Sequence, residues 1–206
     1  IDYQEWYTKR CLEAMNDFYG TEWRQEARTI GKEVPYVTLE DVQQANETAK
    51  VRNTGITFET RPDWTSADHV DRMLELGATK VEIGVQSTYD FVLSRMNRGH
   101  TVADSIEANR ILRDSGLKVG FHMMPGLPGM DQEREIRNFE RLFDNPGFKP
   151  DYLKIYPTLV TEGTELNEMW VRGDYQAISD EDAVELLARI KTLIPKWVRL
   201  QRIQRD

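Results

Sequence analysis

The chain has 206 residues, of which 39% are hydrophobic and 30% charged, and its formal net charge at pH 7 is −8. The composition is typical of a globular protein, and the acidic balance argues against a generally basic nucleic-acid-binding surface. No apolar run approaches the roughly 20 residues that span a bilayer, so we expect no membrane partner. The single cysteine, Cys11, excludes an internal disulfide and favours a reducing, cytoplasmic location.

Short β-rich runs alternate with amphipathic helical segments along the chain. The first helix is expected at 3–19 and contains Cys11, which we interpret as packed and inert. Later helices include 66–76, with Val70, Met73 and Leu74 at helical spacing, and 181–194. Strands are expected at 55–59, 80–85, 117–123, 152–156 and 197–203. The first four are almost continuously apolar, which is typical of parallel strands buried on both faces.

Helix boundaries carry local signals. Five tetrads in which Asp follows Ser or Thr by three residues predict capped helix starts, at Thr38, Thr65, Ser87, Thr101 and Ser179. Three glycines are expected to end helices, at Gly20, Gly77 and Gly116.

The alternation of strand and helix predicts an α/β fold with a parallel sheet. No Gly-x-Gly-x-x-Gly follows a strand, so a barrel, or part of one, is favoured over a dinucleotide-binding sheet. The active site of a barrel lies at the C-terminal ends of its strands. Polar residues at those ends are therefore the candidates for function.

Three of these candidates have two interpretations on the residues alone. Glu59 is either part of an internal ion pair, for example with Arg61, or the receptor of a ligand amine. Gln86 is either a buried amide that ties down the backbone or a site residue. Arg98, at the end of the following helix, would by itself be interpreted as a surface cation.

The strand at 117–123 runs into a loop with two Pro-Gly pairs, Pro125-Gly126 and Pro128-Gly129. Such a rigid loop with exposed backbone suits a flat ligand held by main-chain hydrogen bonds. His122 lies at its start, but the three histidines of the chain show no ligand spacing. We therefore predict no metal ligands among them.

Several segments occur together in one order, namely Gly55-Ile-Thr-Phe-Glu-Thr-Arg-Pro-Asp63, Glu82-Ile-Gly-Val-Gln-Ser87, Met96-Asn-Arg-Gly-His100, Gly120-Phe-His-Met-Met-Pro-Gly-Leu-Pro-Gly129, Lys154-Ile-Tyr-Pro-Thr158 and Arg202-Ile-Gln-Arg-Asp206. Together they closely resemble the radical S-adenosylmethionine domain of Elongator protein three, the catalytic tRNA-modifying subunit of Elongator and its archaeal and bacterial counterparts. The resemblance runs from end to end of the chain.

The resemblance implies a parallel-sheet, partial TIM-like (βα)6 radical SAM barrel whose first strands are missing from this chain. Residues 1–206 would be one domain, the C-terminal two-thirds of that barrel, without the cluster-binding N-terminal part and the acetyltransferase domain. The start at Ile1, without a methionine, and the stop at Asp206 within a strand-like segment also favour a piece of a longer protein.

The function implied is that of a tRNA wobble-uridine acyltransferase, which modifies carbon 5 of uridine 34 to a carboxymethyl-type group. The parent enzyme would use S-adenosylmethionine, a 4Fe–4S cluster and acetyl-CoA, with Elongator-type partner subunits or a homodimer. Three thiolates hold such a cluster, and Cys11 alone cannot supply them, so we expect the fragment by itself to be inactive.

Site residues also follow from the resemblance. Glu59, Gln86 and Arg98 would hold the methionine part of the cofactor, since a carboxylate suits its ammonium and a guanidinium its carboxylate. The loop at 122–129, with His122, Met124 and Gly126, would frame the adenine or ribose. Related enzymes carry an acid where this chain has His122.

Lys154 and Tyr156 are the predicted catalytic residues. Residues two apart on a strand point the same way, so both face either the barrel interior or the helices. We predict the interior, with Lys154 facing an acyl-CoA, a phosphate or the cofactor, and Tyr156 supporting the substrate. In the alternative, Lys154 points outward and pairs with a helix carboxylate.

Two other functions fit the same sequence. One is a different radical SAM enzyme that acts on a small molecule. The other is a non-catalytic scaffold barrel that binds partners, against which the convergence of Glu59, Gln86 and Arg98 on one pocket would argue.

Overall fold

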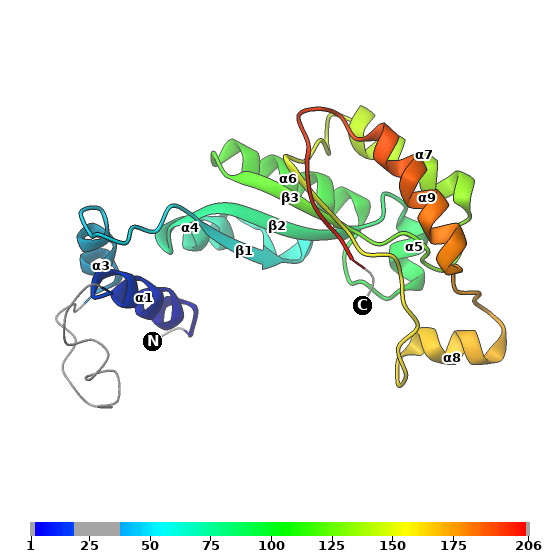
Figure 1. Ribbon diagram of the computed structural model, residues 1–206, viewed down its shortest axis with the longest axis horizontal. Helices are drawn as coiled ribbons and strands as arrows, with labels where there is room; N and C mark the ends of the chain where they lie inside the picture. The colour runs from blue at the N-terminus through cyan, green and yellow to red at the C-terminus, as the bar shows by residue number, and fades with distance from the viewer. Residues whose placement is uncertain (1–2, 19–37, 205–206) are drawn as a thin grey trace. The chain divides into compact units, whose positions relative to one another are not determined.

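The computed structural model describes residues 3–18 and 38–204 (Figure 1). The predictions made at Tyr19, Gly20, Arg205 and Asp206 lie outside these residues. Within the described ranges, no helix combines the length and the apolar character needed to cross a membrane.

The chain forms two compact units, and the smaller one contains residues 1–56 and 71–79. In this unit, α1 (Tyr3–Asn16) packs against α3 (Leu39–Asn46), and the side-chain amide of Asn46 donates to Oδ1 of Asn16 at 2.7 Å. Arg72 and Glu5 form an ion pair at 2.7 Å. Cys11 lies in α1 as predicted and is only half-buried. The prediction that residues 1–206 form one domain stays a prediction.

The larger unit, residues 57–70 and 80–206, contains most of a five-stranded sheet. Its strands are β1 (Ile56–Thr60), β2 (Ala78–Gln86), β3 (Lys118–Met123), β4 (Tyr152–Ile155) and β5 (Arg199–Ile203). They lie side by side in chain order, and the pairs β2–β3, β3–β4 and β4–β5 are parallel (Figure 1). The predicted α/β fold with a parallel sheet is confirmed.

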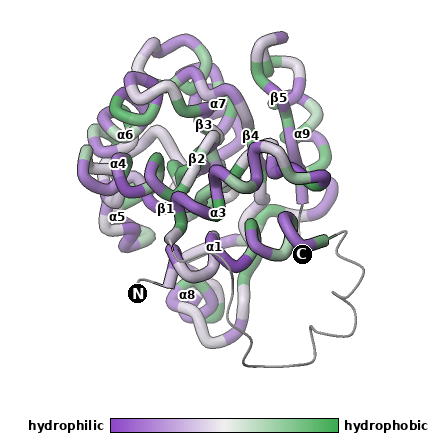
Figure 2. Tube along the Cα trace, turned by 90° about the vertical axis from the view of Figure 1, so that its left-hand side faces the viewer, coloured by the Kyte–Doolittle hydropathy of each residue, from purple (hydrophilic) through white to green (hydrophobic). Residues whose placement is uncertain are grey.

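Helices follow the strands, as a parallel sheet requires. They are α4 (Ala67–Glu75), α5 (Asp90–Arg95), α6 (Val102–Asp114), α7 (Gln132–Asp144), α8 (Glu165–Arg172) and α9 (Asp180–Leu193), with a 3₁₀ turn, η1, at Pro62–Trp64. α6 packs on β3, and α7 packs on α9. Along α6, hydrophobic and hydrophilic residues alternate in the manner of an amphipathic helix (Figure 2).

The predicted burial on both faces is confirmed in β2, whose residues 81–86 are all buried, but it is wrong for β1, and the second face of the sheet is polar rather than apolar. On one face, Val81, Ile83, Val119, Phe121 and Leu153 are fully buried, and this face packs against helices. Because side chains alternate along a strand, the residues between them point to the other face, where the sheet carries polar groups. β1 is nowhere buried, and its residues alternate between half-buried and exposed. The central strands thus have one apolar face and one polar face.

The capping prediction is confirmed at three helix starts and wrong at two. Thr38 and Thr101 form capping boxes, and the Ser179 hydroxyl accepts from the backbone N–H of Asp182. Thr65 instead donates its hydroxyl to the carbonyl of Pro62, and Ser87 accepts from the N–H of Tyr89. In both cases the hydroxyl is used inside the turn that precedes the helix, so it does not reach the helix N-terminus.

The predicted helix ends and helix faces are confirmed with one exception. Gly77 and Gly116 have φ values of +85° and +79°, the left-handed conformation expected after a helix. On α4, Val70 is buried, but Leu74 is 40% exposed. The stripe of buried residues on this helix is therefore shorter than its apolar pattern predicts.

Candidate functional site

Gln86 ends β2 in a conformation that is rare for a residue with a side chain. Its φ is +65°, and its side chain is 7% exposed. The main-chain carbonyl accepts from the N–H of Met124 at 3.0 Å, which ties the end of β2 to the loop after β3. The side-chain Oε1 is buried and has no partner among the described residues. A strained backbone that carries an unpaired buried acceptor is typical of a binding site.

Arg98 follows α5 and turns back towards the same strand end. Its Nε is buried without a hydrogen-bond partner, and no carboxylate lies within ion-pair distance among the residues that the structure describes. Burial lowers the pKa of Arg98, and the nearby charge of Arg61 lowers it further, whereas Asp63 opposes the shift. Arg98 is therefore no ordinary surface cation, contrary to the interpretation from its position alone.

Gly84 brings Gln86 and Arg98 together. A Cβ atom at this position would lie 2.8 Å from Nε2 of Gln86 and 3.2 Å from Nη2 of Arg98. Both side chains thus lie directly over the backbone of Gly84, where any larger residue would displace them. The unpaired Nε of Arg98 can donate to a ligand carboxylate, and the unpaired Oε1 of Gln86 can accept from a ligand ammonium.

Glu59 does not join this pair. Its side chain is 57% exposed, and its Oε1 lies 2.7 Å from the ammonium of Lys154. Arg61, the partner considered from the sequence, pairs instead with Asp63 at 2.9 Å. Glu59 is therefore in an internal ion pair, but with a residue 95 positions away along the chain.

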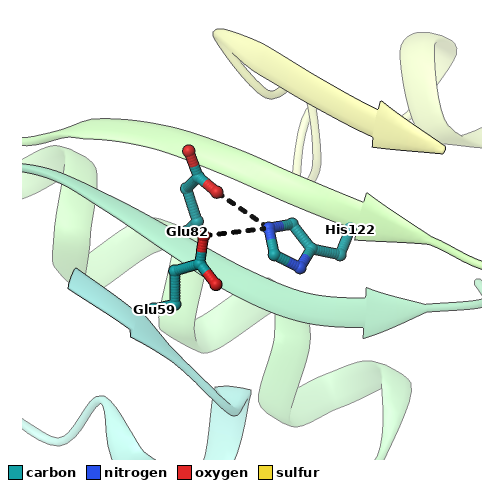
Figure 3. A group of neighbouring side chains, drawn as sticks. All are labelled: Glu59, Glu82 and His122. Atoms are coloured by element: carbon teal, nitrogen blue, oxygen red, sulfur yellow. Dashed lines mark hydrogen bonds and ion pairs between the residues drawn. The ribbon is translucent and has the colours of Figure 1, made fainter. Parts of the chain in front are cut away.

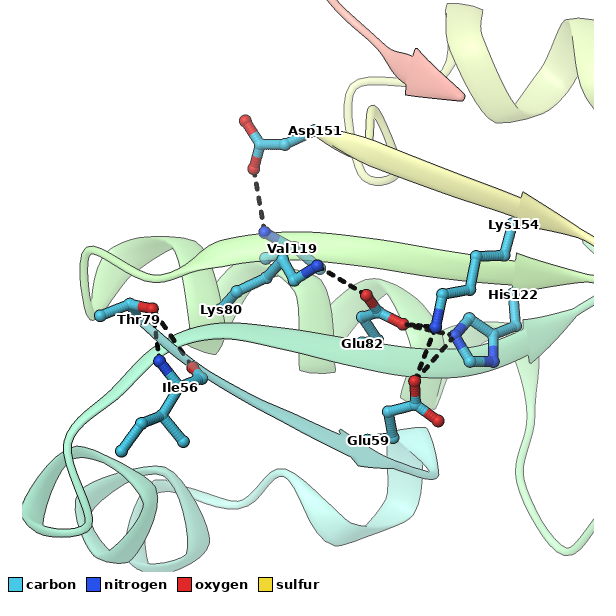
Figure 4. Close-up of polar contacts among 9 residues, drawn as sticks. All are labelled: Ile56, Glu59, Thr79, Lys80, Glu82, Val119, His122, Asp151 and Lys154. Carbon is cyan, nitrogen blue, oxygen red and sulfur yellow. Dashed lines mark hydrogen bonds and ion pairs between the residues drawn. The ribbon is translucent and has the colours of Figure 1, made fainter. Parts of the chain in front are cut away.

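Glu82 is the centre of a polar cluster on the polar face of the sheet (Figure 4). Its side chain is 2% exposed, and its Oε1 lies 2.7 Å from the ammonium of Lys80. Its Oε2 contacts the ammonium of Lys154 and lies 2.8 Å from Nε2 of His122. Burial alone would raise the pKa of Glu82, but the contacts with Lys154, Lys80 and His122 outweigh it and lower that pKa strongly.

Two further residues complete the surroundings of Glu82. Gly120 on β3 leaves the space that its side chain fills, since a Cβ there would lie 2.9 Å from Cγ of Glu82. Gln201 on β5, with its amide nitrogen turned towards Glu82, donates to Oε1 at 3.2 Å and accepts from Lys80 at 2.9 Å. The cluster therefore joins side chains from all five strands.

Glu59, Glu82 and His122 have the composition of a metal site. One ligand atom from each lies within 4.8 Å of the others (Figure 3). However, the Lys154 ammonium contacts both carboxylates and takes the position that a cation would need. That the histidines of the chain bind no metal stays a prediction.

Lys154 points to the polar face, with a side chain that is 12% exposed. Burial would lower its pKa, but the ion pairs with Glu59 and Glu82 raise it. Both carboxylates lie on strands, so the alternative in which Lys154 pairs with a helix is wrong. The Tyr156 ring meets that of His122 edge-on, with centroids 5.6 Å apart.

The Pro-Gly loop is fixed by contacts within the chain. The N–H of Gly126 donates to Oε1 of Glu135 at 2.7 Å, and its carbonyl accepts from the Tyr175 hydroxyl at 2.7 Å. The carbonyl of Pro125 accepts from the N–H of Thr158 at 2.8 Å. The main-chain groups of Gly126 are therefore occupied, and a flat ligand would meet the loop through its other atoms.

Glu135 on α7 is almost completely buried beneath this loop. Burial raises its pKa to about 7, although the hydrogen bonds from Gly126 and Asn138 oppose the shift. Asn138 in turn accepts from both the N–H and the hydroxyl of Thr88, each at 2.8 Å. This network connects the loop after β2 with the loop after β3.

The sequence alone did not single out Glu82, Lys80, Gln201 or Glu135. For Glu82 and Lys80 a signal was present, since charged residues interrupt an otherwise apolar strand and must be paired if buried. For Glu135 there was none, because it lies among several charged residues at the start of an amphipathic helix.

A parallel sheet with polar residues at its strand ends is found in several classes of protein. Comparison with known families identifies the class to which this chain belongs. The model of the radical SAM superfamily matches residues 12–142, and that of the Radical_SAM C-terminal domain matches residues 150–206. The chain belongs to the radical SAM superfamily.

The chain is also similar to particular members. It is 48% identical over 206 residues to the tRNA uridine(34) acetyltransferase of Methanocaldococcus jannaschii, covering 100% of this chain and 35% of that protein. It is 52% identical over 152 residues to human Elongator complex protein 3, covering 74% of this chain and 28% of that protein. The chain thus spans about a third of the length of these curated relatives.

Solved structures show the same fold. The structure of the archaeal Methanocaldococcus infernus Elp3 with an N-terminal deletion matches with a TM-score of 0.88 and 48% identity, over 99% of this chain and 44% of that one. Coproporphyrinogen III oxidase from Escherichia coli, described as a radical SAM enzyme, matches 75% of this chain and 35% of that one with a TM-score of 0.55. At 16% identity, the second match shows the fold alone.

Proposed function

We propose that the chain is the cofactor-binding part of an enzyme that acylates the wobble uridine of tRNA at carbon 5, giving a carboxymethyl-type product. The observation that carries this proposal is the pair of Gln86 and Arg98 above Gly84, because the unpaired Nε of Arg98 suits the carboxylate of an amino acid and the unpaired Oε1 of Gln86 suits its ammonium. The names of the relatives supply the substrate, a tRNA uridine, and the acetyl group.

The residues present fit the methionine part of S-adenosylmethionine. Arg98 would pair with its carboxylate, while Gln86 would use its free Oε1 to accept from its ammonium. Glu59 can share that ammonium only by exchanging part of its contact with Lys154. The bound cofactor supplies the radical hydrogen abstraction that gives the superfamily its name.

The residues present do not fit the 4Fe–4S cluster. Cys11 is the one cysteine of the sequence and lies in α1, in the smaller unit. Three thiolates are needed to hold such a cluster. The cluster therefore has no role in the reaction that residues of this chain could supply.

Lys154 and Tyr156 are proposed to act on the substrates. The ammonium of Lys154, kept charged by Glu59 and Glu82, would attract the phosphates of acetyl-CoA or of the RNA. Tyr156, beside His122, would support the reacting uridine. Acetyl-CoA as co-substrate, Elongator-type partner subunits or a homodimer, and a cytoplasmic location belong to the same proposal.

The test is nucleoside mass spectrometry on tRNA incubated with the full-length protein, reduced and reconstituted with its cluster. We expect a modified uridine only when S-adenosylmethionine and acetyl-CoA are both present, and its loss in Arg98→Ala. A cofactor turnover that is independent of tRNA and leaves the uridine unmodified would contradict the proposal. That result would instead support a radical SAM enzyme that acts on a small molecule.

A further inference from the structure

A patch of arginines and aromatic rings lies on α5 and α7, outside the site described above. It consists of Tyr89, Phe91, Arg95, Arg134, Arg137 and Arg141, and is called here the α5–α7 patch. The four arginines are exposed and Phe91 is 48% exposed, whereas Tyr89 is half-buried. None of these residues contributes to the polar cluster around Glu82 or to the pair of Gln86 and Arg98.

The helix geometry of α7 gathers three of the arginines. Arg134, Arg137 and Arg141 are three and four residues apart, so they form one stripe along the helix. The opposite stripe, which includes Phe139 and Phe143, is buried. α7 therefore presents one row of cations to its surroundings.

Direct contacts join this row to α5. The guanidinium of Arg141 lies over the Tyr89 ring, 5.7 Å from its centroid. The Tyr89 and Phe91 rings are 5.6 Å apart. The two elements thus form one surface rather than two separate features.

Gly129, in the loop after β3, lies between α5 and α7. A Cβ on Gly129 would lie 3.1 Å from the Phe91 ring and 3.7 Å from Nη1 of Arg95, and its carbonyl accepts from Arg134 at 2.8 Å. The patch therefore begins at the C-terminal ends of β2 and β3, the edge of the sheet at which a barrel carries its active site.

The cations of the patch lack the acidic partners that neutralise arginines elsewhere in the chain. Arg110 on α6, for example, pairs with Glu107 at 2.6 Å and with Asp114 at 2.8 Å. In the part of the chain that the structure describes, Arg95, Arg137 and Arg141 have no carboxylate within 4.0 Å, and Arg134 reaches only Asp131, at 3.6 Å.

Two neighbouring carboxylates are already occupied. Asp90 accepts from the backbone N–H of Val102 at 2.7 Å, and Glu133 pairs with Arg189 at 3.3 Å. Glu140 and Asp144 are exposed on α7 but form no ion pair with the patch arginines among the described residues, so these guanidinium groups remain open to an external anion.

We propose that the α5–α7 patch binds single-stranded RNA next to the reacting uridine. The arginines would contact successive phosphates, and one unstacked base would stack on Phe91, the combination by which proteins hold single strands. This inference rests on the proposed function, since it assigns the substrate tRNA to a surface of this chain. An acidic protein partner would use the cations but would not need an exposed ring.

The test compares tRNA binding by variants of the full-length protein, measured by fluorescence anisotropy at several salt concentrations. For the double variant Arg137→Gln/Arg141→Gln we expect affinity to fall about tenfold or more and the slope of log K against log salt to fall by about 1–2, as two lost phosphate contacts require. Arg110→Gln removes an equally exposed arginine that has its own carboxylates, and it should leave both quantities unchanged.

The role of the Phe91 ring is tested with a second set of variants. Phe91→Ala should weaken tRNA binding about fivefold or more, whereas Phe91→Tyr should restore it, since one stacked base contributes about 1–3 kcal/mol. Heparin, a polyanion without bases, should lose affinity in the double arginine variant but not in Phe91→Ala. An equal loss of tRNA and heparin in Phe91→Ala would show a structural role for the ring and overturn the stacking assignment.

The remaining outcomes separate this inference from the proposed function. If the wild-type protein modifies tRNA and the patch variants bind it like wild type, the patch assignment is wrong and the proposed function stands. If patch-dependent binding is found without any uridine modification, the proposed function fails and the patch stands. Normal tRNA binding together with loss of a partner subunit would show that the patch binds protein.

Discussion

The Nε2 atom of His122 on β3 lies 2.8 Å from Oε2 of Glu82 on β2, although 40 residues separate them in the chain. The contact lies on the polar face of the sheet, and the Lys154 ammonium contacts the same carboxylate oxygen. Glu82 therefore holds His122 on β3 and Lys154 on β4 in place.

Glu82→Gln should destabilise the protein and disturb Lys154. The change keeps the size of the side chain but removes the charge that Lys80, Lys154 and His122 share. Loss of a buried, charge-assisted hydrogen-bonding group costs about 1.5–3 kcal/mol, which should appear as a lower midpoint in urea unfolding. Glu107→Gln, which removes an exposed carboxylate from α6, is the control, and an equal midpoint for both variants would contradict the role of Glu82.

Gly84→Ala should impair cofactor binding without unfolding the protein. The added Cβ would lie 2.8 Å from Nε2 of Gln86, so the amide and the neighbouring Arg98 must move. We expect a rise in the dissociation constant for S-adenosylmethionine, measured by calorimetry on the reconstituted full-length protein. Gly116→Ala is strained by its left-handed φ of +79° but adds a Cβ with no atom within 4 Å, so it controls for a destabilising glycine replacement away from the site and should leave the affinity unchanged. Unchanged affinity in Gly84→Ala would show that the two side chains do not form the site.

Glu135 should make stability depend on pH near neutrality. Burial raises its pKa to about 7 from 4.5, so the folded protein binds an extra proton between these values. The contribution of this group to stability is therefore greatest at low pH and falls as the pH rises through that window, by about 3 kcal/mol in all. Glutamine does not titrate, so the melting temperature of Glu135→Gln relative to wild type should rise from pH 5 to pH 8.

The control for this pH dependence is Glu140→Gln, which changes an exposed carboxylate on the same helix. Its melting temperature relative to wild type should stay constant over the same range. A constant difference for Glu135→Gln as well would mean that Glu135 is ionised throughout and that the hydrogen bond from Gly126 fully compensates its burial.

Lys154→Met should abolish modification of the uridine while the protein remains folded. Methionine keeps the apolar stem of the side chain but removes the ammonium that Glu59 and Glu82 hold on the polar face. The assays are tRNA-dependent turnover of acetyl-CoA and the yield of modified uridine, both in the full-length enzyme. If both persist at wild-type levels, Lys154 has only a structural role.

The sheet could be predicted from the sequence because its signals are local. Apolar β-branched runs such as 80–85 mark the strands, and the alternation with helices leaves little choice but a parallel order. The polar character of one face of the sheet could not be predicted from these runs, because Lys80 and Glu82 lie within the mainly apolar run 80–85. Their side chains are accommodated by Gly120 and Gln201, which are brought close only by strand pairing.

The candidate site was predictable only in part. Gln86 and Arg98 were named and are brought together, because each lies at a strand or helix end close to Gly84. Glu59 was grouped with them, but its oxygen contacts Lys154, whose position depends on the order of four strands. Glu135 was missed because its burial depends on the Pro-Gly loop folding over α7, a contact that no local pattern indicates.

The most direct test of the central claim is the affinity of the reconstituted full-length protein for S-adenosylmethionine after Arg98→Ala. Loss of a hydrogen bond to a charged group costs about 1.5–3 kcal/mol, so the dissociation constant should rise roughly 10- to 150-fold. Arg110→Ala, on the exposed face of α6, should leave it unchanged. A dissociation constant for Arg98→Ala equal to that of wild type would remove Arg98 from the site and contradict the account.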